Sequence, residues 1–182
     1  MKIVSTILKR AAGPVLVAGL VVTSSATAAT AAAAPPPGST AFRILGGLVV
    51  LQARNGVNNV VTASTSVSTS PGRLILKDTT GIAIGPGCTR VDANTADCGI
   101  AATVTRLAVQ LGDGNDTFDG STANVSTTAD AGTGTDSVTT NGRSDTVSVE
   151  DNTGGDTVDC GGGTDTVFAD PGDTITHCER QF

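Results

Sequence analysis

Aspartates recur at short intervals through the C-terminal half of this 182-residue chain. Each is followed by Thr or Ser and then by an apolar residue, and the six triplets begin at Asp116, Asp136, Asp145, Asp156, Asp165 and Asp173. The chain contains 15 Asp but only 2 Glu. Because Asp is a poor helix former and its carboxylate suits hard cations, this excess indicates turns, caps or oxygen ligands.

The triplets belong to a nonapeptide repeat that is rich in glycine. The good copies are LGDGNDTFD (111–119), AGTGTDSVT (131–139), TNGRSDTVS (140–148), DNTGGDTVD (151–159) and CGGGTDTVF (160–168). The copy at 169–176 is one residue short, and 120–128 fits only by its position. These copies resemble the repeat of the RTX, or hemolysin-type calcium-binding, family, whose pattern is Gly-Gly-x-Gly-x-Asp-x-apolar-x. LGDGND and CGGGTD are the most specific parts of a resemblance that covers residues 105–180.

The resemblance implies an all-β fold, a right-handed parallel β-roll or β-helix solenoid with nonapeptide repeats in the C-terminal half. In that family, each repeat forms a Gly-rich turn and a short strand, and successive coils stack at the strand spacing of roughly 4.8 Å. The apolar residue of each triplet would point inward, at Phe118, Val138, Val147, Val158, Val167 and Ile175. A coil that buries two small side chains needs few aromatics, and this chain has four Phe and no Trp or Tyr.

The resemblance also implies Ca²⁺ ions between the Gly-rich turns. Ca²⁺ takes six to eight oxygen ligands, which turn carbonyls and an Asp carboxylate supply, and Gly allows the positive φ that such turns require. The implied metal-binding residues are Gly112, Asp113, Gly114, Asp116, Gly132, Gly134, Asp136, Asp145, Asp156, Gly161, Gly163, Asp165 and Asp173. Stacked carboxylates about 5 Å apart repel one another, so we expect calcium binding to be coupled to folding.

The register of the copies decides which turns share an ion, because copies separated by one lie on the same edge. One edge would carry Asp116, Asp136, Asp156 and Asp173, and the other would carry Asp145 and Asp165. Copy 120–128 lacks the Asp, and Asn141 and Arg143 stand at Gly positions, so we expect one to three sites. The alternative is that the triplets are solvated turn caps on a degenerate solenoid without any ion.

Residues 1–34 have the pattern of an export signal. Lys2, Lys9 and Arg10 form a basic start, residues 11–22 are apolar, and small Ala-rich sequence follows. The alternative is a retained membrane anchor, although the apolar run is shorter than the roughly 20 residues that a span requires. We therefore expect a secreted, extracellular protein without a membrane span after signal cleavage, and the export route stays open.

The remaining chain divides by composition into a lead-in rich in Ala, Pro and Gly (35–40), a β-rich region (41–110) and the repeats (111–182). Strand-sized runs are expected at residues 42–45, 48–53, 58–62, 73–77, 82–84 and 103–111. Residues 41–112 contain six basic and three acidic side chains, whereas residues 113–182 contain two basic and fourteen acidic ones. Such an acidic segment repels nucleic acid and stays disordered unless something neutralises it.

Four cysteines in an exported chain suggest two disulfides, for which three pairings exist. Cys88 and Cys98 bracket a short segment that suits a local hairpin, and Cys160 and Cys178 lie one 18-residue coil apart. The segments GCTRVDANTADC and VDCGGGTDTVFADPGDTITHCE are similar to those of small secreted calcium-binding repeat proteins of actinobacteria. A zinc site from cysteines and His177 is the competing interpretation, but the spacing lacks a CxxC.

The chain shows no HExxH or GxSxG motif and has a single His, so no catalytic constellation is visible. We expect a secreted calcium-binding protein with a structural or interaction role, whose protein or cell-envelope partner stays open. The alternative is a small β-helical carbohydrate-active enzyme or lectin-like binder. The chain, however, has no Trp or Tyr side chain on which a sugar ring could stack.

Overall fold

The computed structural model describes residues 34–68 and 70–182. Apart from Ala34, the expected export signal lies outside these residues. The described chain contains sixteen β-strands and one short 3₁₀ helix, η1 (Ala101–Thr103). No helix in this part of the chain is long and apolar enough to cross a membrane. The expectation of a nearly all-β chain is confirmed.

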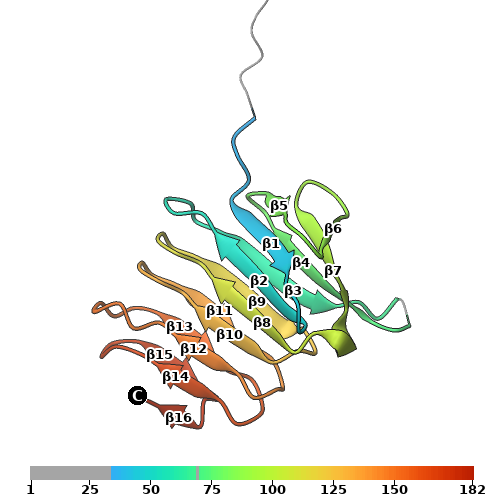
Figure 1. Cartoon of the computed structure of the whole chain (residues 1–182). Helices are drawn as coiled ribbons and strands as arrows, with labels where there is room; N and C mark the ends of the chain where they lie inside the picture. The colour runs from blue at the N-terminus through green and yellow to red at the C-terminus, as the bar shows by residue number, and fades with distance from the viewer. Residues whose placement is uncertain (1–33, 69) are drawn as a thin grey trace, which may run out of the picture. The chain divides into compact units, whose positions relative to one another are not determined.

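The strands form two eight-stranded sheets (Figure 1). The first contains, in order, β16 (Arg180–Gln181), β14 (Thr166–Phe168), β12 (Thr146–Ser148), β10 (Thr127–Asp130), β8 (Arg106–Gln110), β2 (Leu48–Ala53), β1 (Ser39–Arg43) and β5 (Ile82–Ile84). The second contains β15 (Thr174–Thr176), β13 (Thr157–Asp159), β11 (Ser137–Thr139), β9 (Thr117–Thr122), β3 (Val60–Thr65), β4 (Arg73–Asp78), β7 (Thr95–Ile100) and β6 (Thr89–Arg90).

Both sheets are mixed, and the direction of strand pairing changes along the chain. Antiparallel pairs join β1 to β2, β3 to β4, and β7 to both β4 and β6. Each strand from β8 to β14 pairs in parallel with the strand two places further along the chain. The connecting turns therefore stack along two edges, which positions the aspartates that precede the strands.

The inward side chains of the repeats form a narrow core. Phe118, Val138 and Val158 are aligned across β9, β11 and β13, and each is at most 1 % exposed. Val147 and Val167 are aligned in the other sheet and are fully buried. Five of the six predicted inward positions are thus confirmed as buried, and Ile175 packs partly buried against the same core.

Several boundaries differ from the sequence expectations. β1 begins at Ser39, inside the segment expected as a lead-in, because Gly38 and Ser39 already bond to the backbone of Thr80 and Gly81. The run expected as a strand from residue 103 instead begins with Thr103 in η1 and forms β8 only from Arg106. The segment between the first two cysteines, which sequence patterns left as a hairpin or turn, contains the antiparallel pair β6 and β7.

The structure contains two disulfides, Cys88–Cys98 and Cys160–Cys178, which is the pairing that the spacing favoured. The Cα atoms of Cys160 and Cys178 lie 5.2 Å apart, within the range that a disulfide tolerates. Because all four sulfurs are bonded, none is available as a zinc ligand. His177 is exposed, and its Nδ1 lies 2.8 Å from Asp159 Oδ1.

The narrow core predicts a large effect from its one aromatic side chain. Phe118→Ala should lower the free energy of unfolding by about 3–5 kcal/mol, because it empties a fully packed position. Phe168→Ala is the matched control, since Phe168 is 38 % exposed and stacks on Phe182 near the C-terminus. It should cost about 1 kcal/mol. Urea denaturation of both variants checks this, and equal losses would contradict the burial described above.

Candidate functional site

The predicted metal-binding residues lie on two edges of the stacked turns. We call the turns before β9, β11, β13 and β15 the first edge, and those before β10, β12, β14 and β16 the second edge. The first edge carries Gly112, Asp113, Gly114, Asp116, Gly132, Gly134, Asp136, Asp156 and Asp173. The second edge carries Asp145, Gly161, Gly163 and Asp165. This division follows the register expected from the sequence.

On the first edge, each aspartate carboxyl bonds to the backbone of the turn before it. Oδ1 of Asp136 accepts a hydrogen bond from the Asp116 N–H at 2.7 Å, and Oδ1 of Asp156 accepts one from the Asp136 N–H at 2.7 Å. Asp173 Oδ1 continues the series by accepting from the Asp156 N–H at 3.0 Å. Asn59 begins it, because its N–H donates to Asp116 Oδ1 at 2.6 Å. We call this series the first ladder.

The second edge carries a shorter series of the same kind, the second ladder. The Thr127 N–H donates to Asp145 Oδ1 at 2.6 Å, and the Asp145 N–H donates to Asp165 Oδ1 at 2.7 Å. The Asp165 N–H donates to Glu179 Oε2 at 2.7 Å. Both ladders therefore begin at a residue without a charge and end at a carboxylate near the C-terminus.

Glycine is required where the turns of the first edge lie closest together. The Thr133 N–H donates to the Gly112 carbonyl at 2.9 Å, and the Gly114 N–H donates to the Thr133 carbonyl at 3.0 Å. A Cβ on Gly132 would lie 1.8 Å from the Gly112 carbonyl oxygen. Gly132 also has a φ of 86°, which side chains disfavour. The glycines therefore allow the backbones of neighbouring turns to lie in direct contact, with N–H to carbonyl hydrogen bonds between them.

The ladder aspartates are buried without a basic partner. Asp116, Asp136, Asp145, Asp156 and Asp165 are each at most 3 % exposed. In the described chain, the ion pairs are Arg73–Asp97 and His177–Asp159, and neither involves these five carboxyls. The second oxygens of Asp116, Asp136 and Asp165 are buried and have no hydrogen-bond partner. A buried carboxylate in this condition requires either a proton or a cation.

The electrostatics of the ladders favour neutralisation. Burial raises the pKa of Asp116 and of Asp136 to about 6, against the opposing effect of the N–H that each accepts. Neighbouring carboxylates add to the rise, Asp78 and Asp113 for Asp116. Burial also raises the pKa of three further ladder aspartates, Asp145, Asp156 and Asp165. The alternative interpretation of the triplets as solvated turn caps is wrong for these five aspartates, because they cap backbone N–H groups from buried positions.

Sequence patterns missed several residues that extend this arrangement. Asn59 occupies the ladder position in the turn before β3. It precedes Asp116 by 57 residues, with β3 to β8 between them, so a search for a period of nine does not find it. Glu179 lies outside any Asp-Thr-Val triplet. Asp170 Oδ2 accepts from the N–H groups of Asp151 and Asn152, each at 2.7 Å.

The oxygen atoms that a cation could use at the first edge come from turn carbonyls and single carboxyls, and not from a cluster of acidic or His side chains. No three His, Cys, Asp or Glu side chains in the described residues gather as a metal site. The unpartnered carboxyl oxygens of Asp116 and Asp136 instead lie at turns whose carbonyl oxygens retain a second lone pair beside their turn-to-turn hydrogen bonds. Oxygen ligands of these two kinds are those of Ca²⁺ sites.

No model of a protein family, no curated protein and no solved structure matches this chain in comparisons with known proteins. The residues and geometry described above are therefore the basis for assigning a function.

Because the turns are in contact, a single methyl group added at Gly132 should force them apart. Gly132→Ala should lower the free energy of unfolding by on the order of 2–4 kcal/mol, because of the contact with Gly112 and the positive φ. Gly142→Ala is the matched control on the second edge, since a Cβ there meets no atom within 4 Å. It should change stability by less than about 0.5 kcal/mol. A Gly132→Ala protein as stable as the control would contradict the stacking.

The raised pKa values predict the pH dependence of the metal-free protein. The folded state keeps protons on Asp116 and Asp136 up to a pKa of about 6, whereas the unfolded chain loses them near pH 4. The free energy of unfolding should therefore fall as pH rises from about 4 to about 6, by on the order of 2 kcal/mol after allowance for solvent screening. Urea denaturation in chelator across this range measures it. A rise in stability over the same range would contradict the burial of these carboxyls.

Proposed function

We propose that this protein is a secreted calcium-binding repeat protein of the RTX, or hemolysin-type, kind. Ca²⁺ is held in the Gly-rich turns, and its binding is coupled to folding of the acidic half. The observation that carries the proposal is the set of buried, unpaired carboxyls, three of which, Asp116, Asp136 and Asp165, have a second oxygen without a partner. The role that follows is structural or one of interaction, because no catalytic constellation supports an enzyme.

A cation neutralises these carboxyls at neutral pH better than protons do. A pKa of about 6 leaves Asp116 and Asp136 mostly ionised at pH 7, so protonation alone leaves buried charge there. An ion held near their unpartnered oxygens supplies the missing positive charge and accepts the free lone pairs. Ca²⁺ is favoured over Zn²⁺ because the turns offer carboxyl and carbonyl oxygens and no nitrogen or sulfur ligand.

The two edges differ in how well they suit an ion. On the first edge, Asp116 and Asp136 end two intact Gly-rich turns that contact each other directly. On the second edge, Asp165 has an unpartnered oxygen and follows Gly161 and Gly163, but the facing turn carries Arg143. We therefore assign the strongest site to the turns that end at Asp116 and Asp136, and a weaker one to the turn that ends at Asp165. Asp156 and Asp173 continue the first edge.

The parallel pairing of each strand with the strand two places on supports a right-handed β-roll in which two nonapeptides complete one coil. The triplets are aligned in that register, as in Thr117–Asp119 against Ser137–Thr139. Such a roll brings carboxylates of successive coils together, so its acidic half folds where calcium is abundant. Export before folding accounts for this order of events, and two disulfides agree with an oxidising compartment.

Calcium titration of variants of Asp136 tests the proposal. Asp136→Asn keeps an oxygen that accepts from the Asp116 N–H but replaces the unpartnered, charged oxygen with an amide nitrogen. It should weaken calcium binding roughly 10- to 100-fold in calorimetry, since the ion loses a charged ligand. Asp130→Asn removes the same charge from an exposed side chain on β10, and its affinity should equal that of the wild type.

Stability measured with and without calcium completes the test. Saturating calcium, at about 100 times its dissociation constant, should raise the free energy of unfolding by about 2.7 kcal/mol per site. The chelated protein should show a weaker β-structure signal in circular dichroism, and the addition of calcium should restore that signal. If neither calcium nor a chelator changes the spectrum or the unfolding midpoint, the proposal is wrong and the ladders are structural caps alone.

A further inference from the structure

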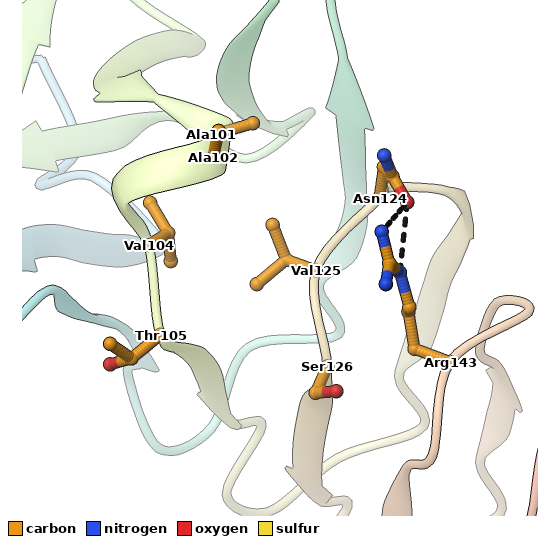
Figure 2. Close-up of a pocket in the computed structure, with 8 residues that line it drawn as sticks. All are labelled: Ala101, Ala102, Val104, Thr105, Asn124, Val125, Ser126 and Arg143. Carbon is orange, nitrogen blue, oxygen red and sulfur yellow. Dashed lines mark hydrogen bonds between the residues drawn. The ribbon is translucent and has the colours of Figure 1, made fainter.

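A pocket on the second edge has a composition unlike that of the rest of the repeats. Its volume is about 230 Å³, and it lies between η1 with the residues after it and the turn that precedes β10. Ala101, Val104 and Thr105 line one side, and Val125 and Ser126 line the other (Figure 2). Arg143, from the next turn along the edge, completes the lining.

The guanidinium of Arg143 is oriented at this pocket by two hydrogen bonds, and other N–H groups of the same guanidinium remain available as donors. Its Nε and Nη2 donate to Asn124 Oδ1 at 2.9 and 2.6 Å, the two bonds drawn in Figure 2. No acceptor among residues 34–68 and 70–182 bonds to its Nη1. Because Asn124 is neutral, this contact orients the guanidinium and leaves its charge uncompensated.

Two further arginines bond to segments next to the pocket, although neither lines it. Arg43 donates from Nη2 to the carbonyl and the hydroxyl of Thr103 in η1, at 2.7 and 2.9 Å. Arg106 follows the lining residue Thr105 and donates to the Thr128 hydroxyl at 2.7 Å. In the described part of the chain, none of these arginines forms an ion pair.

The carboxyl closest in sequence to Arg143 does not cancel this charge. Asp145, two residues further on, is 2 % exposed and accepts from the N–H groups of Thr127 and Asn141, so it faces the interior. Arg143 therefore brings an unpaired positive charge to this pocket. A positive site with free donors attracts an oxyanion.

We propose that this pocket binds the oxyanion group, carboxylate or phosphate, of a small ligand of about the size of one sugar residue. Arg143 Nη1 and the hydroxyl of Ser126 supply donors for the anion, and Ala102 and Thr105, which are the exposed lining residues of the other side, would contact the body of the ligand. The volume is below the roughly 300–1,000 Å³ of pockets for drug-sized ligands, which restricts the ligand to a single compact unit. Arg143 places a positive charge in its own turn, so the anion and the proposed Ca²⁺ ions would occupy different turns.

Amide chemical shifts of the purified protein test the proposal directly. Galacturonate and glycerol 1-phosphate present a carboxylate and a phosphate, and galactose is the neutral control. We expect one of the two anions to shift the amides of residues 101–105 and 124–126 in saturable fashion, and the one that binds more tightly identifies the anionic group. Equal binding of galactose, or no saturable shifts at these amides with either anion, would overturn the proposal.

A charge-matched pair of variants separates the pocket from general electrostatics. Arg143→Gln should weaken binding of the anion about tenfold or more, because a charge-assisted hydrogen bond is lost. Arg54→Gln removes the same charge from an exposed side chain in the turn before β3, which does not line the pocket, and should leave the affinity unchanged. Arg143 is exposed, so its variant should retain the fold, which the wild-type pattern of remaining amide shifts would verify. Equal losses in both variants would overturn the proposal.

Discussion

The hydrogen bond from a backbone N–H of one turn to a buried aspartate carboxyl of the next is the interaction on which the C-terminal half depends. It aligns turn on turn, as Asp116, Asp136 and Asp156 show on the first edge. The same bond brings carboxyls together in a dry environment. The arrangement that gives the strands their register therefore also buries negative charge, which a proton or a cation must neutralise.

The rest of the chain accommodates this constraint. The N-terminal strands form a broader core of Leu51, Leu74, Leu76 and Ile82, all fully buried, in a region with few acidic side chains. The first ladder begins on that region at Asn59, where an amide replaces the carboxyl and no further charge is added. At the other end of the ladders, the Cys160–Cys178 disulfide joins the turns before β14 and β16, whose strands have few later strands to pack against. The acidic repeats thus continue from a largely apolar core at one end and are crosslinked by a disulfide at the other.

Much of this arrangement could be predicted from the sequence because it is local and periodic. The triplets predicted the short strands, the inward position of Val138 and Val147, and the division of the aspartates between two edges. The 18-residue spacing predicted the pairing of Cys160 with Cys178. What escaped prediction depends on contacts between distant segments. The role of Asn59 became visible only when β3 was seen to lie beside β9, and the pocket at Arg143 depends on η1, which lies outside the repeats. The burial of the aspartates escaped prediction for the same reason, because turn residues are usually solvated and only the stacking of neighbours removes them from water.

The most direct measurement of the central claim is the titration of individual aspartate carboxyls by ¹³C NMR, in chelator and in saturating calcium. In chelator, Asp116 and Asp136 should titrate near pH 6, well above the ordinary pKa of an Asp carboxyl. In calcium, both ladder carboxyls should stay ionised to a lower pH, because the ion favours the charged form. Carboxyls that titrate near pH 4 in both conditions, without any response to calcium, would contradict the account.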